Sequence, residues 1–265
     1  MSASASSSPQ FLYKYRSFSS PCDFERTQRI VCDNHIYFAP PCSFNDPFDC
    51  RPAFSFDAPV DEMKAYYRRL CGKRMPHLTG LEVEAEIERL FAEPGSDMCA
   101  PQGQQKIQEL HSHVLAQELG VLCLSSQRDH ILMWSHYADC HRGICLEFDT
   151  RASFLAGARP IGYEDSRLLI NPFRDRDEEM AEKTFLMKAS HWHYEGEWRL
   201  IRYDGPGEVA FEPEALTGIV LGALTPPEAE RQLREWAAKR ERPLQLSRAY
   251  PDQQAFRLHV RPLAD

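Results

Sequence analysis

The sequence predicts an α+β fold, with a mixed or mostly antiparallel sheet core flanked by helices and a helical insertion. Short apolar runs typical of strands occur in both halves of the chain, whereas helical periodicity is concentrated at about 60–119. The two kinds of segment do not alternate regularly, which disfavours a doubly wound parallel sheet. We therefore expect one domain over residues 11–265, preceded by a disordered Ser/Ala-rich leader at residues 1–10.

Two strands, a rigid loop and three helices are predicted in the first half of the chain. Residues 11–18 (FLYKYRSF) alternate aromatic and polar side chains, and residues 35–39 (HIYFA) form a second apolar run. The segment PPCSFNDPFDC at 40–50 predicts a rigid loop, because proline, asparagine and aspartate favour turns. Three helices are predicted. The first covers residues 61–70, and the second begins at the Thr79–Glu82 capping box. The third ends before Gly120, and its inward face contains Ile107, Leu110, Val114 and Leu115.

The second half is richer in strand patterns. Buried or alternating runs predict strands at 120–125, 143–148, 197–203 and 218–222, and a terminal hairpin from 244–249 and 256–260. Helices are expected at 129–138 with Asp129 as the cap, at 177–189, and after a Thr225 cap with Leu233 and Trp236 facing inward.

Composition restricts the classes of function. The 265 residues carry a net charge of −8, which disfavours a broad nucleic-acid surface. No apolar run approaches the ~20 residues of a membrane helix, so no membrane partner is expected. The nine cysteines are odd in number and none is spaced as C-x-x-C, which predicts reduced thiols and a cytoplasmic location. His136, Cys140 and His141 lack a recognised zinc-ligand spacing, so no metal is expected there.

Two candidate clusters are built on a loop and a short helix. The loop at 43–49 presents Asn45, Asp46 and Asp49 and contains two phenylalanines that should anchor it, although turn formation alone explains these polar residue types. Residues 133–138 of the short predicted helix and the turn that follows it contain Trp134, Ser135, His136, Tyr137 and Arg142. An aromatic helix face of this kind belongs to a core more often than to a ligand site.

The third cluster contains two glutamates in the segment YEGEWR. Glu195 and Glu197 are two residues apart at the start of a predicted strand, so their side chains should lie on one side of it. The aromatic residues around them provide apolar surface, beside which the pKa of a carboxyl group rises. An edge strand with solvated charges explains the same residues equally well.

Several motifs in order resemble a known family. LYKYR, YFAPPCSFNDPFDC, GVLCLS, ILMWSHYADCHRGICLEFD, YEGEWRLI and GIVLG are similar to the bacterial family catalogued as domain of unknown function 2971. Some members of that family are linked to phage-abortive systems, which implies a role in antiphage defence or as a toxin. The resemblance covers most of the chain and is weakest in the helical block and the terminal hairpin.

The layout of these motifs is also similar to that of mono-ADP-ribosyltransferases. This resemblance implies that Arg16 on the first strand holds the dinucleotide, Tyr37 and Phe38 line the nicotinamide site, and Glu197 is catalytic, with Glu195 completing a paired-glutamate motif. Ser125 or Ser135 would be the polar residue of the middle strand, although the family's Ser-Thr-Ser run is missing. The remaining residues expected to bind NAD are Asn45, Trp134, His136, Tyr137 and Arg142.

The function expected from this resemblance is an NAD-consuming ADP-ribosyltransferase-like enzyme. NAD would be the substrate, and the acceptor an unidentified protein or nucleic acid. A carboxylate would stabilise the oxocarbenium-like transition state, and the enzyme requires Arg16 and Glu197 to face one cleft. Two alternatives remain open: a non-catalytic module that binds a nucleotide or a protein, and a metal-dependent hydrolase of nucleotides or nucleic acid that uses Asp46, Asp49 and Glu197.

Overall fold

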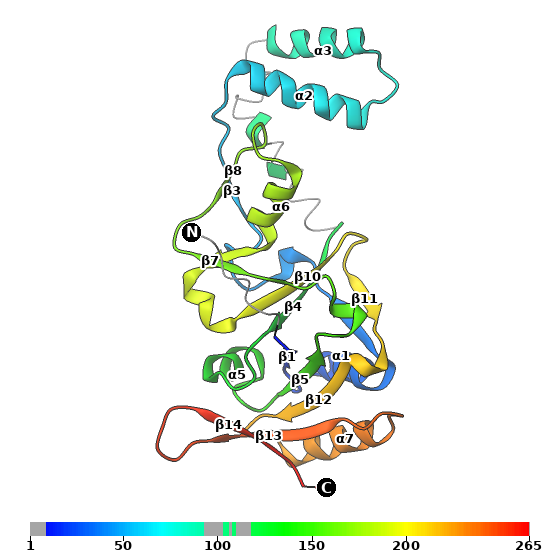
Figure 1. Ribbon diagram of the computed structural model, residues 1–265, viewed down its shortest axis with the longest axis vertical. Coiled ribbons are helices and arrows are strands. Elements are labelled where there is room, and N and C mark those ends of the chain that lie inside the picture. Colours follow the sequence, from blue (N-terminus) through cyan, green and yellow to red (C-terminus); the bar gives the residue numbers. More distant parts are fainter. Residues whose placement is uncertain (1–8, 93–102, 106–107, 110–117, 265) are drawn as a thin grey trace. The chain divides into compact units, whose positions relative to one another are not determined.

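A computed structural model describes residues 9–92, 103–105, 108–109 and 118–264 of the chain (Figure 1). The chain divides into two compact units. The first contains Met1–Pro40, Leu119–Tyr163 and Ser190–Asp265, and the second contains Pro41–Glu118 and Glu164–Ala189. The helical insertion expected at about 60–119 falls in the second unit. The expectation of one domain stays a prediction.

Two sequence predictions lie outside the described residues. Residues 1–8 of the expected leader are not described, and neither are Ile107, Leu110, Val114 and Leu115 of the third predicted helix. None of the described helices is both long and apolar enough to cross a membrane.

The first unit is built around a large mixed sheet. Within the described residues, eight strands form this main sheet in the order β14-β13-β12-β5-β1-β4-β10-β6. Strands β12 and β13 are parallel, and the other neighbours are antiparallel. Its strands are β1 (Phe11–Arg16), β4 (Gly120–Ser125), β5 (Ile144–Asp149), β6 (Arg159–Pro160), β10 (Glu197–Arg202), β12 (Leu216–Leu221), β13 (Gln245–Pro251) and β14 (Leu258–Pro262).

Shorter elements complete the first unit. Strand β2 (His35–Phe38) pairs with β11 (Gly207–Ala210) in a separate antiparallel ribbon. The helices are α1 (Pro21–Asp33), α5 (Ile131–Tyr137) and α7 (Pro227–Ala238), and the 3-10 turns are η2 (Ser153–Leu155), η3 (Ser190–Glu195) and η4 (Pro213–Ala215). Strand β7 (Gly162–Glu164) lies where the chain passes from the first unit to the second.

The alternation of side chains along β1 separates two cores, one on each face of the main sheet. Leu12 belongs to a large apolar cluster with residues of α1 and α7, such as Ile30 and Trp236. Its neighbour Tyr13 points to the other face and belongs to a smaller cluster with Trp134 of α5. We call these the α1/α7 face and the α5 face. Strand geometry explains the division, because successive side chains point to opposite sides.

Helix α1 was not predicted from the sequence. Its N-cap is Ser20, whose side chain accepts a hydrogen bond from the backbone N–H of Asp23, and Pro21 occupies its first turn. The helix ends at Asn34, which adopts the left-handed conformation at φ 55°. The helix buries Thr27, Ile30 and Val31, but most of the segment is polar, so its sequence does not show a clear apolar face.

Two predicted caps are wrong. Helix α5 has His130 as its N-cap without a side-chain hydrogen bond, so Asp129 does not cap it. Helix α7 has Pro226 at the N-cap, and the Thr225 hydroxyl instead donates to the carbonyl of Gly143 at 2.8 Å. The inward positions of Leu233 and Trp236 are confirmed, since they are 0% and 3% exposed.

The second unit is mainly helical. Helix α2 packs with α3, and strands β3 and β8 pair in parallel. The predicted capping box is confirmed: Glu82 accepts a hydrogen bond from the backbone N–H of Thr79 at 2.8 Å. The elements of the second unit are η1 (Pro41–Ser43), β3 (Ala53–Phe54), α2 (Val60–Arg74), α3 (Gly80–Ala92), β8 (Leu169–Ile170), α6 (Asp177–Phe185) and β9 (Met187–Ala189).

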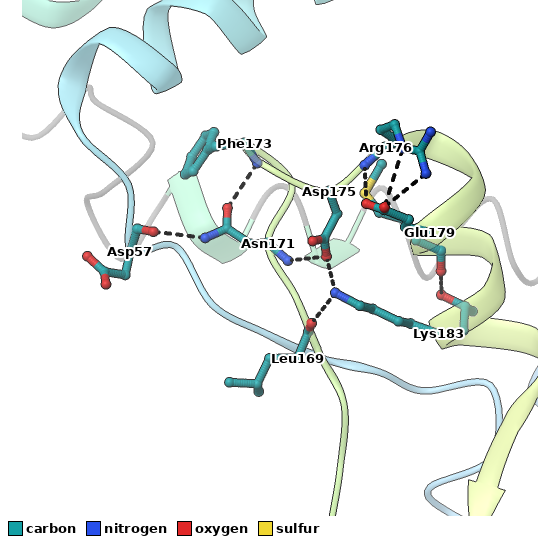
Figure 2. A network of polar contacts seen from close by, with 10 residues as sticks. Asp57, Leu169, Asn171, Phe173, Asp175, Arg176, Glu179 and Lys183 are labelled. Atoms are coloured by element: carbon teal, nitrogen blue, oxygen red, sulfur yellow. Dashed lines mark hydrogen bonds and ion pairs between the residues drawn. The ribbon is translucent and has the colours of Figure 1, made fainter. Parts of the chain in front are cut away.

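A polar network connects the segments of this unit around Asn171 and Asp175 (Figure 2). The Asn171 side chain donates to the carbonyl of Asp57 at 2.8 Å, and its backbone N–H donates to Asp175 at 2.9 Å. Lys183 on α6 donates to the same Asp175 carboxylate at 2.6 Å. The turn after β8 is thereby fixed to both the segment that precedes α2 and to α6.

Candidate functional site

Side chains from α5 and η3 meet beside the α5 face of the main sheet. The Tyr137 hydroxyl donates to Oε1 of Glu195 at 2.6 Å. His136 Nδ1 lies 2.9 Å from the Tyr194 hydroxyl, and the His130 ring stacks on Tyr194 with ring centroids 5.3 Å apart. We call these five residues the His–Tyr cluster. It unites three residues predicted to belong to the site, His136, Tyr137 and Glu195, with two that were not.

The short helix α5 places one of its aromatic side chains in the core and another at the surface. Trp134 is fully buried, its indole N–H donates to the carbonyl of Arg128 at 3.0 Å, and its ring meets Tyr15 edge-on. Trp134 therefore belongs to the core, which is the commoner role of such a residue, and does not line an open site. Tyr137 is three residues further on and partly exposed, and His136 is exposed.

Ser125 and Gly196 hold η3 against the end of β4. The Ser125 hydroxyl donates to the carbonyl of Glu195 at 2.5 Å and accepts from the backbone N–H of Gln127 at 2.9 Å. Gly196 has φ 49°, and a Cβ there would lie 2.5 Å from the Ser126 hydroxyl. These contacts give Ser125 a structural role. They also require glycine at position 196, because an L-residue is strained at this φ and lacks space.

Glu197 is bound to its neighbour Arg199. Arg199 Nε lies 2.6 Å from Oε1 and Nη2 lies 3.0 Å from Oε2, which is a bidentate pair. Both residues are buried, with 5% and 1% of their surface exposed. Burial and the Glu197 carboxylate raise the pKa of the nearby Cys123 thiol. The negative charge that would stabilise a cationic transition state is thus already balanced by Arg199.

The two glutamates do not share one strand. The expected common side rested on strand geometry at both positions, but Glu195 ends η3 and the chain turns at Gly196 before β10 begins at Glu197. Glu195 contacts Tyr137 of α5, whereas Glu197 contacts Arg199 of its own strand.

Arg16 does not share a face with Glu197. Glu197 pairs with Ser125, which pairs with Tyr13, so all three point to the α5 face. Arg16 is three residues from Tyr13 on β1 and therefore points to the α1/α7 face. Its guanidinium accordingly donates to the Thr27 hydroxyl of α1 at 3.0 Å. The structure does not assemble the pair that the transferase hypothesis requires.

The other predicted NAD-binding residues of the first unit are dispersed. Phe38 is 4% exposed and belongs to the α1/α7 core. Tyr37 lies on the β2–β11 ribbon with the Arg26 guanidinium 4.8 Å from its ring centre. Ser135 is partly exposed on α5, and Arg142 is exposed in the turn that precedes β5.

The predicted loop at 43–49 lies in the second unit, and its buried anchors are carboxylates. Asp46 and Asp49 are each 5% exposed, whereas Phe48 is 59% exposed and Asn45 is also exposed. Asp46 accepts a hydrogen bond from the backbone N–H of Phe48 at 2.8 Å, and Asp49 forms an ion pair with Lys188 at 3.5 Å. Phe48 therefore does not anchor the loop, whereas Phe44 is half-buried, and turn formation accounts for Asp46.

The described part of the chain contains no group of three or more His, Cys, Asp or Glu side chains placed to hold a metal ion. Its cysteines are free thiols. Sequence reasoning missed His130 and Tyr194 of the cluster. Tyr194 stood within the aromatic run around the two glutamates, so its residue type was a usable signal, whereas nothing in the local pattern marks His130.

Residues 133–200 match a family model described as protein of unknown function (DUF2971). This segment runs from α5 to β10 and includes Tyr137, Tyr194, Glu195 and the Glu197–Arg199 pair. The match supports the resemblance to that family over this part of the chain. No curated protein and no solved structure matches the chain.

Proposed function

We propose that this chain is a non-catalytic binding module that recognises a nucleotide through the His–Tyr cluster. The observation that carries the proposal is the convergence of α5 and η3, in which Tyr137 contacts Glu195 at 2.6 Å and His136 contacts Tyr194 at 2.9 Å. Trp192 extends the aromatic surface, with its ring centre 6.1 Å from that of Tyr194. Aromatic surfaces of this kind stack on bases, and stacking contributes about 1–3 kcal/mol per base.

The polar groups of the cluster suit the edge of a base. A histidine ring both donates and accepts hydrogen bonds, and so does a tyrosine hydroxyl; His136 is exposed and Tyr137 is partly exposed. Glu195 is 3% exposed, so its carboxylate does not face the ligand; it accepts a hydrogen bond from Tyr137 and thereby fixes that hydroxyl before a ligand arrives. Glu197 does not take part in this proposal, because it is paired with Arg199 beneath the surface.

The NAD-consuming transferase is the second candidate function. It is favoured by the contact between Glu195, expected to be catalytic, and Tyr137, expected to bind NAD. Against it, Arg16 lies on the other face of the main sheet, and Glu197 would have to exchange Arg199 for the substrate.

Calorimetry with NAD and with AMP, combined with chromatography of released nicotinamide, tests both candidates. A binding module gives saturable heat without release, and Tyr194→Ala weakens binding about tenfold, the loss of one stacked base. Tyr250→Ala is the matched control, because that tyrosine is 37% exposed on β13 and is not part of the cluster. Release of nicotinamide that Glu195→Gln abolishes would favour the transferase. Absence of binding to both nucleotides would reject both functions.

A further inference from the structure

A small cavity opens on the α5 face of the main sheet, between β5, β12, β13 and β14. Its volume is about 110 Å³, well above the roughly 10–15 Å³ that one water molecule requires. Gly218 lies in its wall, where a Cβ would lie 3.0 Å from the carbonyl of Gln245 and 3.5 Å from Oε1 of Glu147. The cavity combines apolar side chains, Val220 and Val260, with the polar residues Glu147 and Ser247.

Glu147 is the buried charge of this cavity. Only 11% of its side chain is exposed, and its Oε1 accepts a hydrogen bond from the Thr217 hydroxyl at 3.0 Å. Arg128 is its cationic partner, but the closest approach is 3.8 Å to Oε2, longer than the 2.7–3.2 Å typical of a hydrogen bond. The Arg128 side chain is itself 47% exposed at the rim.

A buried carboxylate is stabilised by a cation that forms direct hydrogen bonds with it, and Arg128 does not reach that distance. The cavity leaves room beside the carboxylate, and Val220 and Val260 provide a surface for a short alkyl chain. We propose that this cavity is a binding site for a small organic cation, in which a primary ammonium or guanidinium group forms an ion pair with Glu147. The hydroxyl of Ser247, which is 7% exposed, would accept a further hydrogen bond from the same group.

This inference is independent of nucleotide binding by the His–Tyr cluster, because none of the five cluster residues lines the cavity. The proposed cation site gives opposite roles to the charges of Glu147 and Arg128. Glu147 attracts the ligand, whereas Arg128 competes with the ligand for Glu147. Substitution of the two residues should therefore change affinity in opposite directions, which a purely structural ion pair would not produce.

The test is a titration of the full chain with butylamine and with methylguanidine, followed by the NMR shifts of the Gly218 and Ser247 amides. Butanol is the uncharged comparison. We expect saturable shifts at these two amides with either cation and none with butanol. If butanol saturates the same amides at the same concentration, or if neither cation does so at millimolar concentrations, the proposal is wrong.

Three variants sharpen the result. Glu147→Gln keeps an acceptor for Thr217 and should weaken cation binding by about tenfold or more, the loss expected for a charged hydrogen bond. Arg128→Gln leaves the buried carboxylate in place and should strengthen binding several-fold. Glu214→Gln, which removes a carboxylate from an exposed pair with Arg242, should leave binding unchanged. Equal affinity of the wild type, Glu147→Gln and Arg128→Gln would overturn the proposal even if all three fold normally.

Discussion

The bidentate contact between Arg199 and Glu197 determines how this carboxylate responds to substitution. An exposed ion pair contributes little to stability, because water solvates each partner once the other is lost. A buried pair behaves differently, since removal of one charge leaves the other without compensation. Glu197 and Arg199 are buried to 5% and 1% exposure and belong to the second kind.

We therefore expect Glu197→Gln to lower the free energy of unfolding by about 3–5 kcal/mol, as measured by urea denaturation. The matched control is Glu214→Gln, whose partner Arg242 is 64% exposed and which should change stability by about 0.5 kcal/mol or less. Replacing both members, as in Glu197→Leu with Arg199→Met, should recover part of the loss because neither charge of the pair is left buried without its partner. Similar small effects in Glu197→Gln and the control would show that the pair is not structural.

Tyr13 provides a prediction about alkaline pH. Burial, followed by the neighbouring Glu147 charge, raises the pKa of its hydroxyl to about 12, while Arg128 opposes the shift. The unfolded chain releases this proton near pH ~10, so the contribution of Tyr13 to stability is complete below that pH and is lost as the pH rises towards the folded pKa. Tyr13→Phe should flatten the fall in melting temperature between these two values. An unchanged slope would place the alkaline transition at another group.

The residues that converge were identifiable by type, but their partners were not. The sequence marked Tyr137 and Glu195 as polar groups within aromatic segments, and they meet at 2.6 Å. The prediction that Arg16 and Glu197 face one cleft failed. Each of these residues lies on a strand whose register depends on neighbours that are distant in the sequence. Alternation shows which side chains of one strand share a face, but it does not show which face of a second strand, more than 180 residues later in the chain, lies on the same side of the sheet.

Helix α1 was not predicted, although the sequence contains strong local signals for both of its ends. Ser20 followed by Pro21 and Asp23 is a helix start of the usual type, and Asn34 supplies the left-handed end. The strands were easier to predict, because β1, β4, β5 and β10 are apolar or alternating runs of six residues. Helix α5, with seven residues, is too short for its cap to be assigned from spacing alone.

Substitution of Ser20 should measure the value of this cap. Ser20→Ala removes the acceptor for the Asp23 backbone N–H and should destabilise the protein by about 1 kcal/mol. Ser19→Ala is the control, because Ser19 is exposed, lies outside the helix, and its hydroxyl contacts only Ser17 among the described side-chain hydrogen bonds. Thermal unfolding followed by circular dichroism distinguishes the two variants. Equal melting temperatures would show that Pro21 and the packing of α1 suffice to fix the helix start.

The connectivity of the main sheet makes the first unit depend on its earliest strand. β1 lies between β5 and β4, so the strand nearest the start of the chain pairs with segments more than 100 residues later. Strand order of this kind follows from the packing of both faces, which no single segment encodes, and it was therefore not predictable from periodicity. Pairing between distant segments also slows folding, because long loops must close before the contacts form.

A pair of truncations tests this dependence. Removal of residues 1–8 leaves every described contact of β1 in place, and it also keeps the hydrogen bond from the Thr150 backbone N–H to the carbonyl of Gln10, which precedes β1. We expect this variant to keep its melting temperature. Removal of residues 1–16 deletes β1 from the middle of the sheet and should abolish the cooperative transition seen by calorimetry. A cooperative transition in the longer truncation would show that β5 and β4 can close the gap themselves.

The outer strands of the main sheet are β6 and β14, and both contain an arginine followed by a proline: Arg159–Pro160 and Arg261–Pro262. Proline has no backbone N–H to donate to an added strand, and a charged neighbour disfavours stacking against an identical edge. The sheet is thereby protected from growth by strand addition, the usual route by which an open sheet forms filaments. Pro262→Thr restores a donor at one edge, and light scattering should then detect more concentration-dependent self-association than in the wild type.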